Sequence, residues 1–204
     1  MAVDAQAIRA KFGGDYVATE RTFVLGIDHR FTRHMAERFR GRTVLETCTG
    51  AGFTTIALAR VAAHVVTVEI DPAHQDQARE NLARAGLVER VTFITGDVLA
   101  ESVLDGCLPF DAAFLDPDWA QTGPGHVYRF RPSNMRPPAD RLLDCVLSRT
   151  PDAALVLPPQ LELRELDGLP AHEREALFLA GSLELYCLYF GALARVHGPT
   201  ELRI

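Results

Sequence analysis

The sequence is poor in the features that mark several classes of protein. Its net charge is −6, which does not indicate a general nucleic-acid-binding domain. No apolar run reaches the roughly 18 residues that cross a membrane. The N-terminus also has no apolar core of the kind found in signal peptides. These absences predict a cytoplasmic protein with no membrane partner.

Cysteine is also scarce, and its spacing argues against a zinc knuckle. The four cysteines, Cys48, Cys107, Cys145 and Cys187, are separated by 38 to 59 residues, and each has apolar neighbours. Common zinc sites need pairs of ligands only a few residues apart. We therefore expect reduced, buried cysteines and no metal site.

The length and the charge distribution suggest a main domain with a small appendage. The chain has 204 residues, of which 48% are hydrophobic, so one packed core is expected. Residues 1–42 hold eight basic and five acidic side chains, whereas the rest of the chain is acidic. Large apolar residues recur every four positions over 29–41, which predicts a helix. We interpret residues 1–42 as an N-terminal helical extension that contributes to the substrate and cofactor pocket.

The rest of the chain alternates between strand-like and helix-like segments. Strands are expected over 43–47, 64–70, 90–97, 110–117 and 153–159, with one or two more within 182–197. Helices are expected over 53–62, 72–86 and 138–150. This alternation predicts a parallel sheet covered on both faces, and such sheets bind ligands at the carboxyl ends of their strands.

The loop after the first strand, "ETCTGAG" (46–52), has two glycines that let the backbone approach a ligand. A dinucleotide site would have a third glycine where Thr55 stands, and the lysine of a phosphate-binding loop is missing. Glu46 suits a cation better than a polyphosphate. S-adenosylmethionine carries an ammonium and a sulfonium and no phosphate, so the loop favours that cofactor over NAD. An ordinary strand–helix turn remains the alternative.

The next two strand ends each supply a carboxylate. Glu69 lies 17 residues after Gly52, where an acid can accept hydrogen bonds from both ribose hydroxyls. NAD sites share this feature, so it does not separate the two cofactors. Asp97 can accept from the adenine amino group, and Val98 offers an apolar edge. A solvated charge and a turn aspartate are the alternatives.

The fourth strand runs into "FLDPDWAQTGPG" (114–125). Pro117 stiffens the turn, and Trp119 follows too soon to fold back onto the strand. A tryptophan at the ligand edge of a sheet is a stacking platform for a base, worth roughly 1–3 kcal/mol. Alternatively, Trp119 is a core residue under the next helix.

Together, these four loops resemble those of class I S-adenosylmethionine-dependent methyltransferases. "ETCTGAG" is similar to that family's Asp-x-x-x-Gly-x-Gly, and "VEIDP" (68–72) to its Asp-Ile-Asp-Pro. The resemblance implies a Rossmann-like α/β fold, a mainly parallel seven-stranded sheet with helices on both faces, and a methyltransferase domain over 43–204. It implies contacts to S-adenosyl-L-methionine from Glu46, Thr47, Gly50, Gly52, Glu69, Ile70, Asp97, Val98 and Asp116.

The fourth loop also resembles a narrower group. Amino-group methyltransferases have Asp, Asn or Ser before Pro-Pro and an aromatic residue, and the trimethylguanosine-synthase-like enzymes have Pro-Pro-Trp-Gly-Gly-Pro. "PDWAQTGP" (117–124) is similar, with Asp118 in place of the second proline and one inserted residue. This likeness implies an N-methyltransferase that acts on an exocyclic amino group of a nucleobase, the 2-amino group of guanine in RNA.

The same likeness implies the catalytic roles. Asp116 and the Pro117 carbonyl would accept hydrogen bonds from the amine and aim its nitrogen at the methyl group, while Trp119 fixes the base plane. Asp118 is expected to point to solvent; alternatively, it would substitute as an acceptor or take the proton. The substrate-binding residues would be Asp118, Trp119, His126, Arg129 and Arg131. The two arginines, in a basic run, would follow the phosphates of an RNA or nucleotide substrate.

Three other functions remain open at this point. The acidic net charge and the lack of an RNA-binding appendage favour a small-molecule amine as substrate. Asp118 in the motif favours a non-catalytic partner subunit that keeps the methyltransferase fold. A dinucleotide oxidoreductase is disfavoured by Thr55.

Overall fold

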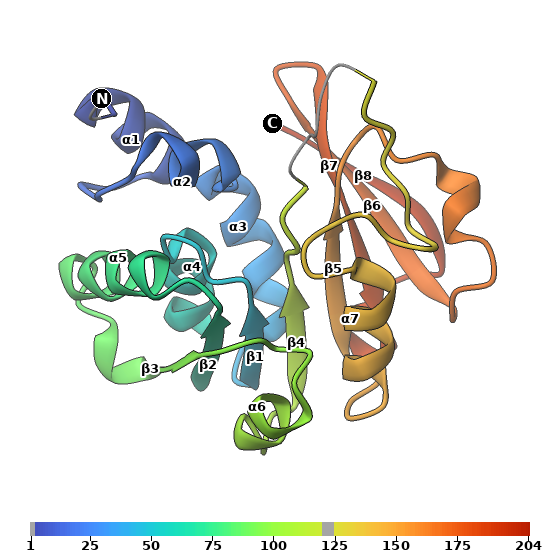
Figure 1. Cartoon of the computed structure of the whole chain (residues 1–204). Helices are drawn as coiled ribbons and strands as arrows, with labels where there is room; N and C mark the ends of the chain where they lie inside the picture. Colours follow the sequence, from blue (N-terminus) through green and yellow to red (C-terminus); the bar gives the residue numbers. More distant parts are fainter. Residues whose placement is uncertain (1–2, 120–124) are drawn as a thin grey trace. The chain divides into compact units, whose positions relative to one another are not determined.

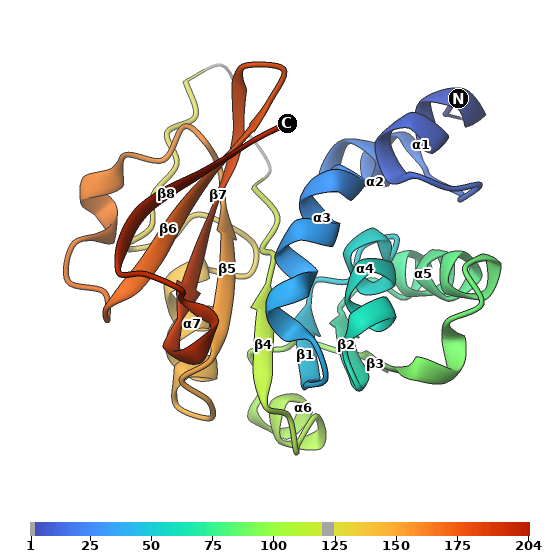
Figure 2. The ribbon, with the colours of Figure 1, turned by 180° about the vertical axis from the view of Figure 1, so that it is seen from behind.

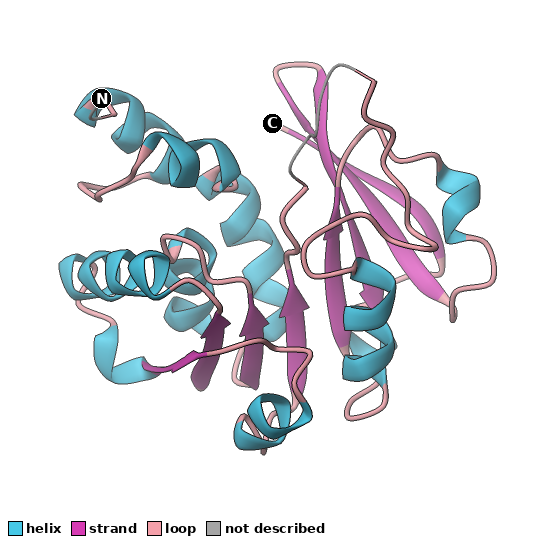
Figure 3. Ribbon diagram, viewed as in Figure 1, coloured by secondary structure: helices cyan, strands magenta, loops and turns pink. Residues whose placement is uncertain are grey.

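The computed structural model describes residues 3–119 and 125–204, which divide into two compact units, Met1–Asp111 and Ala112–Ile204. Figure 1 labels the elements of each unit, and Figure 3 colours them by type. The boundary expected at 42/43 falls inside the first unit, so the N-terminal extension belongs to the same compact body as the first three strands.

The extension is helical, as predicted, and polar side chains cap each helix. Asp4, Thr19 and Asp28 accept hydrogen bonds from first-turn amides of the three helices. The predicted helix over 29–41 is shorter, because the last turn tightens into a 3-10 turn. These elements are α1 (Ala5–Phe12), α2 (Glu20–Leu25), α3 (His29–Ala36) and η1 (Glu37–Phe39).

The first unit contains a parallel sheet in the order β3-β2-β1. Its strands are β1 (Thr43–Thr47), β2 (His64–Glu69) and β3 (Val91–Thr95). The helical elements that follow them are α4 (Phe53–Val61), α5 (Pro72–Arg84), η2 (Val88–Arg90) and α6 (Glu101–Gly106). Seen from behind in Figure 2, α3 and α4 lie in front of β1 and β2, and α5 lies beside α4. Helix α6 is an element that the sequence reading missed.

Helix α5 shows how local sequence sets an element's start. The Asp71 carboxylate accepts from the Ala73 amide at 2.8 Å, and Pro72 occupies the first helical position, where a missing N–H has no cost. Gly86, with φ +70°, follows the end of the helix. Both ends agree with the prediction to within two residues.

The second unit contains a mixed sheet in the order β4-β5-β7-β6-β8. Strand β7 runs antiparallel to both of its neighbours, and the other pairs are parallel. The strands are β4 (Ala112–Leu115), β5 (Ala153–Leu157), β6 (His172–Leu179), β7 (Ser182–Phe190) and β8 (Gly198–Arg203). The helical elements are α7 (Ala139–Leu147), which lies in front of β5 in Figure 1, η3 (Leu163–Leu166) and η4 (Gly191–Leu193).

The prediction of seven strands is wrong, because the described residues of the two units contain eight. The sequence indicated a strand at β7 but not at β6 or β8. β6 reads "HEREALFL", with the buried Glu173 and Glu175 in its polar first half, and β8 reads "GPTELR", so neither has the alternation of apolar and polar residues that marks a strand. Strand β7 supplies both antiparallel pairings of this sheet, one with β5 and one with β6. Across the described part of the chain, no helix is long and apolar enough to cross a membrane.

Candidate functional site

In the first unit, the carboxyl ends of three parallel strands lie at one sheet edge. Thr47 pairs with Val68 across β1 and β2, and Glu69 pairs with Thr95 across β2 and β3. The Gly96 amide, just after β3, donates to the Glu69 carbonyl at 2.9 Å. The register therefore brings together the ends of the loops that were expected to hold the cofactor.

The loop between β1 and α4 has an unusual backbone. Cys48, Gly50 and Gly52 have φ values of 63°, 53° and 79°, so three alternate residues lie in the left-handed region. For Cys48 this conformation is uncommon, since it is neither glycine nor asparagine. A Cβ at Gly50 would meet nothing within 4 Å, which leaves open space on that side of the loop.

Gly52 has a different role from the one predicted. We expected both glycines to allow close approach of a ligand. A Cβ at Gly52 would instead lie 3.0 Å from the Ala78 Cβ and 3.0 Å from the Leu82 Cδ2, both on α5. Glycine is therefore needed here for its positive φ and for tight packing of α4 against α5.

Glu46 is buried at the end of β1, with an exposed fraction of 2%. Its Oε2 accepts hydrogen bonds from the Thr55 hydroxyl at 2.6 Å and from the Thr67 hydroxyl at 2.7 Å. The Thr67 hydroxyl also bonds to the Thr49 hydroxyl, 2.6 Å away. Thr55, noted in the sequence only as a missing glycine, is thus one of the groups that hold this carboxylate.

Burial raises the pKa of Glu46 to about 7, although the hydroxyls of Thr55 and Thr67 act in the opposite direction. The nearby carboxylate of Glu69 raises that pKa further. Within the described residues Glu46 has no cationic partner. A positive charge at this edge would favour its ionised form.

Glu69 ends β2 and is also buried, with 7% of its surface exposed. Its Oε2 accepts from the Gly50 amide at 2.8 Å, and its Oε1 accepts from the Asp71 amide at 3.0 Å. These bonds tie the glycine loop to the second strand. Each carboxylate oxygen keeps a second lone pair, so hydrogen bonds from a ribose remain compatible with this arrangement.

The adenine side of the expected site is partly apolar. Ile70, next to Glu69, is 67% exposed, which is high for a large aliphatic side chain. Val98 is buried, and Asp97 is exposed with its Oδ1 accepting from the Leu99 amide at 2.9 Å. Thr47 is fully buried, so its side chain is poorly placed to contact a ligand.

Helix α4 begins at this edge without a side-chain cap, because its N-cap residue is Gly52. The amides of a helix's first turn have no intrahelical acceptor, and they carry the positive end of the helix dipole. The loop therefore offers open N–H groups close to two buried carboxylates. This donor set suits a ligand end that carries both a carboxylate and an ammonium group.

In the second unit, the expected catalytic segment follows β4. Asp116 and Trp119 are half-buried, and Pro117 is buried. The indole nitrogen of Trp119 is shielded from solvent and has no hydrogen-bond partner among the described residues. The second half of the motif, 120–124, lies outside the described residues.

Asp118 does not point to solvent, and that expectation is wrong. Its Oδ2 lies 3.0 Å from the Arg136 Nη2, and the backbones of the two residues exchange hydrogen bonds of 2.8 and 3.1 Å. The Asp118 side chain is 18% exposed. The residue in place of the second proline thus joins the motif to the segment before α7.

The arginines expected to bind substrate phosphates have carboxylate partners. Arg129 donates to Glu165 at 2.8 Å, and this guanidinium holds the pKa of the Glu165 carboxyl below its usual range. The Phe130 amide donates to the same carboxylate at 3.3 Å. Arg131 lies 3.9 Å from Asp144. These pairs give both arginines a structural role, and their substrate role stays a prediction.

His126, the remaining predicted substrate residue, is half-buried and packs edge-on against Tyr128, with ring centroids 4.6 Å apart. Tyr128 is buried, so the pair anchors the described part of the loop. Among residues 3–119 and 125–204, no group of three or more His, Cys, Asp or Glu side chains is arranged to hold a metal ion.

The sequence reading missed Thr49, Thr67 and Asn81. Thr67 stands among the apolar residues of β2, where a buried hydroxyl needs a polar partner, and Thr49 is the group that it meets. Asn81 follows Ala78 by three residues and precedes Leu82 on the buried stripe of α5. An amide on such a stripe is a signal that could have been recognised, because a buried carboxamide requires several partners.

Comparison with known proteins agrees with this architecture. Residues 44–121 match the family described as "Methyltransferase domain". The chain is 37% identical over 95 residues to a catechol O-methyltransferase of Niastella koreensis, covering 44% of this chain and 43% of the relative. It is 36% identical over 118 residues to a catechol O-methyltransferase of Mycobacterium tuberculosis, covering 56% and 54%. The chain thus spans about half the length of these relatives.

The fold is also similar to a solved structure. A Porphyromonas gingivalis W83 protein assigned to the methyltransferases superposes with a TM-score of 0.73 at 19% identity, covering 91% of this chain and 47% of that one. Residues 44–121 are thus similar in sequence to a methyltransferase domain, and the fold is shared with a solved structure of that kind. These similarities support S-adenosylmethionine as the cofactor. The likeness to the RNA-cap guanine methyltransferases is not supported by these comparisons.

Proposed function

We propose that this protein transfers a methyl group from S-adenosylmethionine to a hydroxyl or amino group of a small planar molecule. One observation carries the cofactor part of the proposal. Glu46 and Glu69 are two buried carboxylates at one sheet edge, and in the described residues both are held only by neutral donors. Buried charge without a counter-ion is costly. A cationic ligand would balance it.

The residues present fit the cofactor's groups. The ammonium and sulfonium would be favoured by the negative potential of Glu46 and Glu69, and the carboxylate by the open amides at the start of α4. The ribose hydroxyls would donate to Glu69. Ile70 would cover a face of the adenine, and Asp97 would accept from its amino group.

The bound cofactor would supply an activated methyl group, so the protein's task is mainly to orient the acceptor. Asp116 would accept a hydrogen bond from the acceptor's O–H or N–H and so direct a lone pair outward. It would also stabilise the positive charge that develops on that atom as the methyl–sulfur bond breaks, leaving S-adenosylhomocysteine, and the acceptor's proton would pass to Asp116 or to water. Trp119 would hold the plane of the acceptor.

The arginines of the second unit bear on which class of acceptor the protein methylates. Arg129, Arg131 and Arg136 each lie within ion-pair distance of a carboxylate, which lowers the net positive charge that this segment presents to RNA phosphates. Two relatives are named catechol O-methyltransferase, which makes small hydroxylated aromatics the first class to test. Methylation of the guanine 2-amino group in RNA is the competing proposal, and it rests on the motif at 116–119.

A labelled-methyl assay tests the proposal. The protein is incubated with methyl-labelled S-adenosylmethionine and, separately, with catechols and phenols, with arylamines and nucleosides, and with total RNA. We expect label in a small-molecule product, with Asp116→Asn much less active than Asp118→Asn. Label in RNA alone would overturn the acceptor class. No transfer to any set, with cofactor binding intact, would favour the non-catalytic partner subunit instead.

A further inference from the structure

Asn81 lies at the centre of a junction within the first unit. It is on α5, is fully buried, and makes three hydrogen bonds. Its Oδ1 accepts from the Val17 amide at 2.8 Å, and its Nδ2 donates to the Val17 carbonyl at 2.9 Å. The same Nδ2 donates to the Ala51 carbonyl at 2.9 Å. One side chain therefore joins the N-terminal extension to the glycine loop.

The extension also packs on this loop through apolar contacts. Phe12 of α1 stacks on Phe53, the first residue of α4, with centroids 3.5 Å apart and planes 7° apart. Tyr16 contacts the same ring from 6.1 Å. Ile8, Phe12, Ala51 and Phe53 form one buried cluster. The extension thus covers the residues on both sides of Gly52.

Asn81 fixes one particular peptide of the loop. The Ala51 carbonyl accepts from Asn81, and the next amide, that of Gly52, donates to the Thr49 carbonyl at 2.9 Å. The peptide between Ala51 and Gly52 is held from both sides. Its orientation sets the direction of the amides at the start of α4, which the proposed function assigns to the cofactor's carboxylate.

We infer that Asn81 is a positioning residue for the cofactor, coupling the docking of residues 3–25 to the conformation of the glycine loop. This inference rests on the proposed cofactor site. By thermodynamic linkage, the coupling works in both directions. The docked extension raises cofactor affinity through the Ala51 peptide, and bound cofactor stabilises the docked extension.

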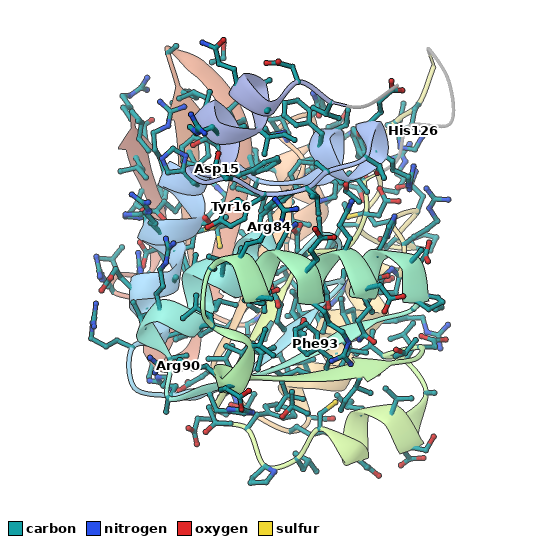
Figure 4. All side chains as sticks on the ribbon, turned by 90° about the vertical axis from the view of Figure 1, so that its left-hand side faces the viewer. Asp15, Tyr16, Arg84, Arg90, Phe93 and His126 are labelled. Atoms are coloured by element: carbon teal, nitrogen blue, oxygen red, sulfur yellow. The ribbon has the colours of Figure 1, made fainter. Side chains whose placement is uncertain are left out.

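Helix α5 offers a matched control one turn earlier. Gln77 accepts from the Thr22 hydroxyl at 2.7 Å, so it too bonds to the extension, but no described bond joins it to the glycine loop. Arg84, one turn further on, reaches the Asp15 carbonyl at 3.3 Å, and Figure 4 shows it beside Asp15 and Tyr16. These contacts attach the extension without touching the Ala51 peptide.

The test combines calorimetry with hydrogen exchange on the full chain, with S-adenosylhomocysteine as the probe. Asn81→Ala should raise the dissociation constant of S-adenosylhomocysteine about tenfold, which is the size expected when buried hydrogen bonds that position a loop are lost. Gln77→Ala should stay within about threefold. In the wild-type protein, the probe should slow exchange over residues 15–25, including the Val17 amide, and Asn81→Ala should abolish that protection.

Equal weakening by the two variants would contradict the inference, because it would make Asn81 an ordinary attachment point. An unchanged exchange rate over 15–25 in the wild-type protein with the probe bound would also contradict it, and this measurement needs no variant to fold. If the wild-type protein fails to bind the probe at all, the proposed function fails instead. The two failures are therefore distinguishable.

Discussion

The two units hold their functional carboxylates in opposite ways. In the first unit, Glu46 and Glu69 are buried and are bonded to hydroxyls and amides, which are neutral. In the second unit, Asp118 and Glu165 face the guanidinium groups of Arg136 and Arg129. Among the described residues, the first arrangement leaves its carboxylates without a counter-ion, whereas the second pairs each carboxylate with an arginine.

This contrast separates a binding edge from a scaffold. Carboxylates that are bonded only to neutral donors create a negative electrostatic potential, which attracts a cation. S-adenosylmethionine carries such cationic groups. Carboxylates paired with arginines fix the path of a loop and leave little field for a charged partner. This difference between the two units therefore explains why the structure supports S-adenosylmethionine as a cofactor better than it supports RNA as a substrate.

The largest expected effect concerns Glu46 and pH. Its folded-state pKa is about 7, above its ordinary value of 4.5, so the folded protein retains a proton that the unfolded chain loses. Stability is therefore lost as pH rises from 4.5 through about 7, by about 3 kcal/mol in total. Glu46→Gln cannot titrate. As pH rises over this range, the unfolding free energy of Glu46→Gln minus that of the wild-type protein should therefore increase by the same amount.

Urea unfolding of the cofactor-free protein between about pH 5 and about pH 8 measures this difference. Glu80→Gln, at an exposed site on α5 paired with Arg84, is the control and should follow the wild-type profile. Parallel profiles for Glu46→Gln and the wild-type protein would show that Glu46 ionises normally.

The next effect concerns Glu69. Glu69→Ala removes two hydrogen bonds to the loop and the expected ribose acceptor, so affinity for S-adenosylmethionine should fall on the order of 100-fold. Calorimetric titration measures the dissociation constant, with Glu80→Ala as the control. A change below about threefold would remove Glu69 from the cofactor site.

Asp116 should behave differently from Glu69. Asp116→Ala should lower turnover by more than about tenfold while the cofactor dissociation constant stays within about twofold, because its proposed role begins with the acceptor. Steady-state kinetics with an acceptor found in the labelled-methyl assay and calorimetry provide the two readouts. Full activity would refute the proposed mechanism.

The smallest effect concerns the scaffold pair. The guanidinium of Arg136 is largely exposed, so Arg136→Gln should cost less than about 1 kcal/mol of unfolding free energy. It should not change cofactor affinity. A large loss of affinity would show that the second-unit loop acts on the cofactor, and the contrast between the units would fail.

The sequence predicted the parts of the fold that have a strong local pattern. Apolar strands such as 43–47 and 153–159 were found within two residues, and Asp71 with Pro72 marked the start of α5. β6 and β8 were missed because their polar residues, grouped in the first half of β6, resemble a solvated loop. Their strand character comes from pairing with β7 and with each other, which is not a local property.

The functional site, like the fold, could be predicted from the sequence only where the signal is local. Carboxylates at strand ends were visible in the sequence, because position along a parallel sheet fixes their edge. The groups that satisfy Glu46 were not visible, since the hydroxyls of Thr55 and Thr67 come from α4 and β2 and reach it only when these elements pack against β1. Asp118 was misjudged for the same reason. Its partner Arg136 lies 18 residues further along the chain, and no local pattern links the two.

The most direct test of the account is a calorimetric titration of the wild-type protein with S-adenosylmethionine and, in parallel, with NAD. The two buried carboxylates without counter-ions predict saturable binding of one S-adenosylmethionine per chain and no binding of NAD. Binding of NAD in preference, or binding of neither ligand by the folded protein, would contradict the assignment of this sheet edge to a cationic cofactor.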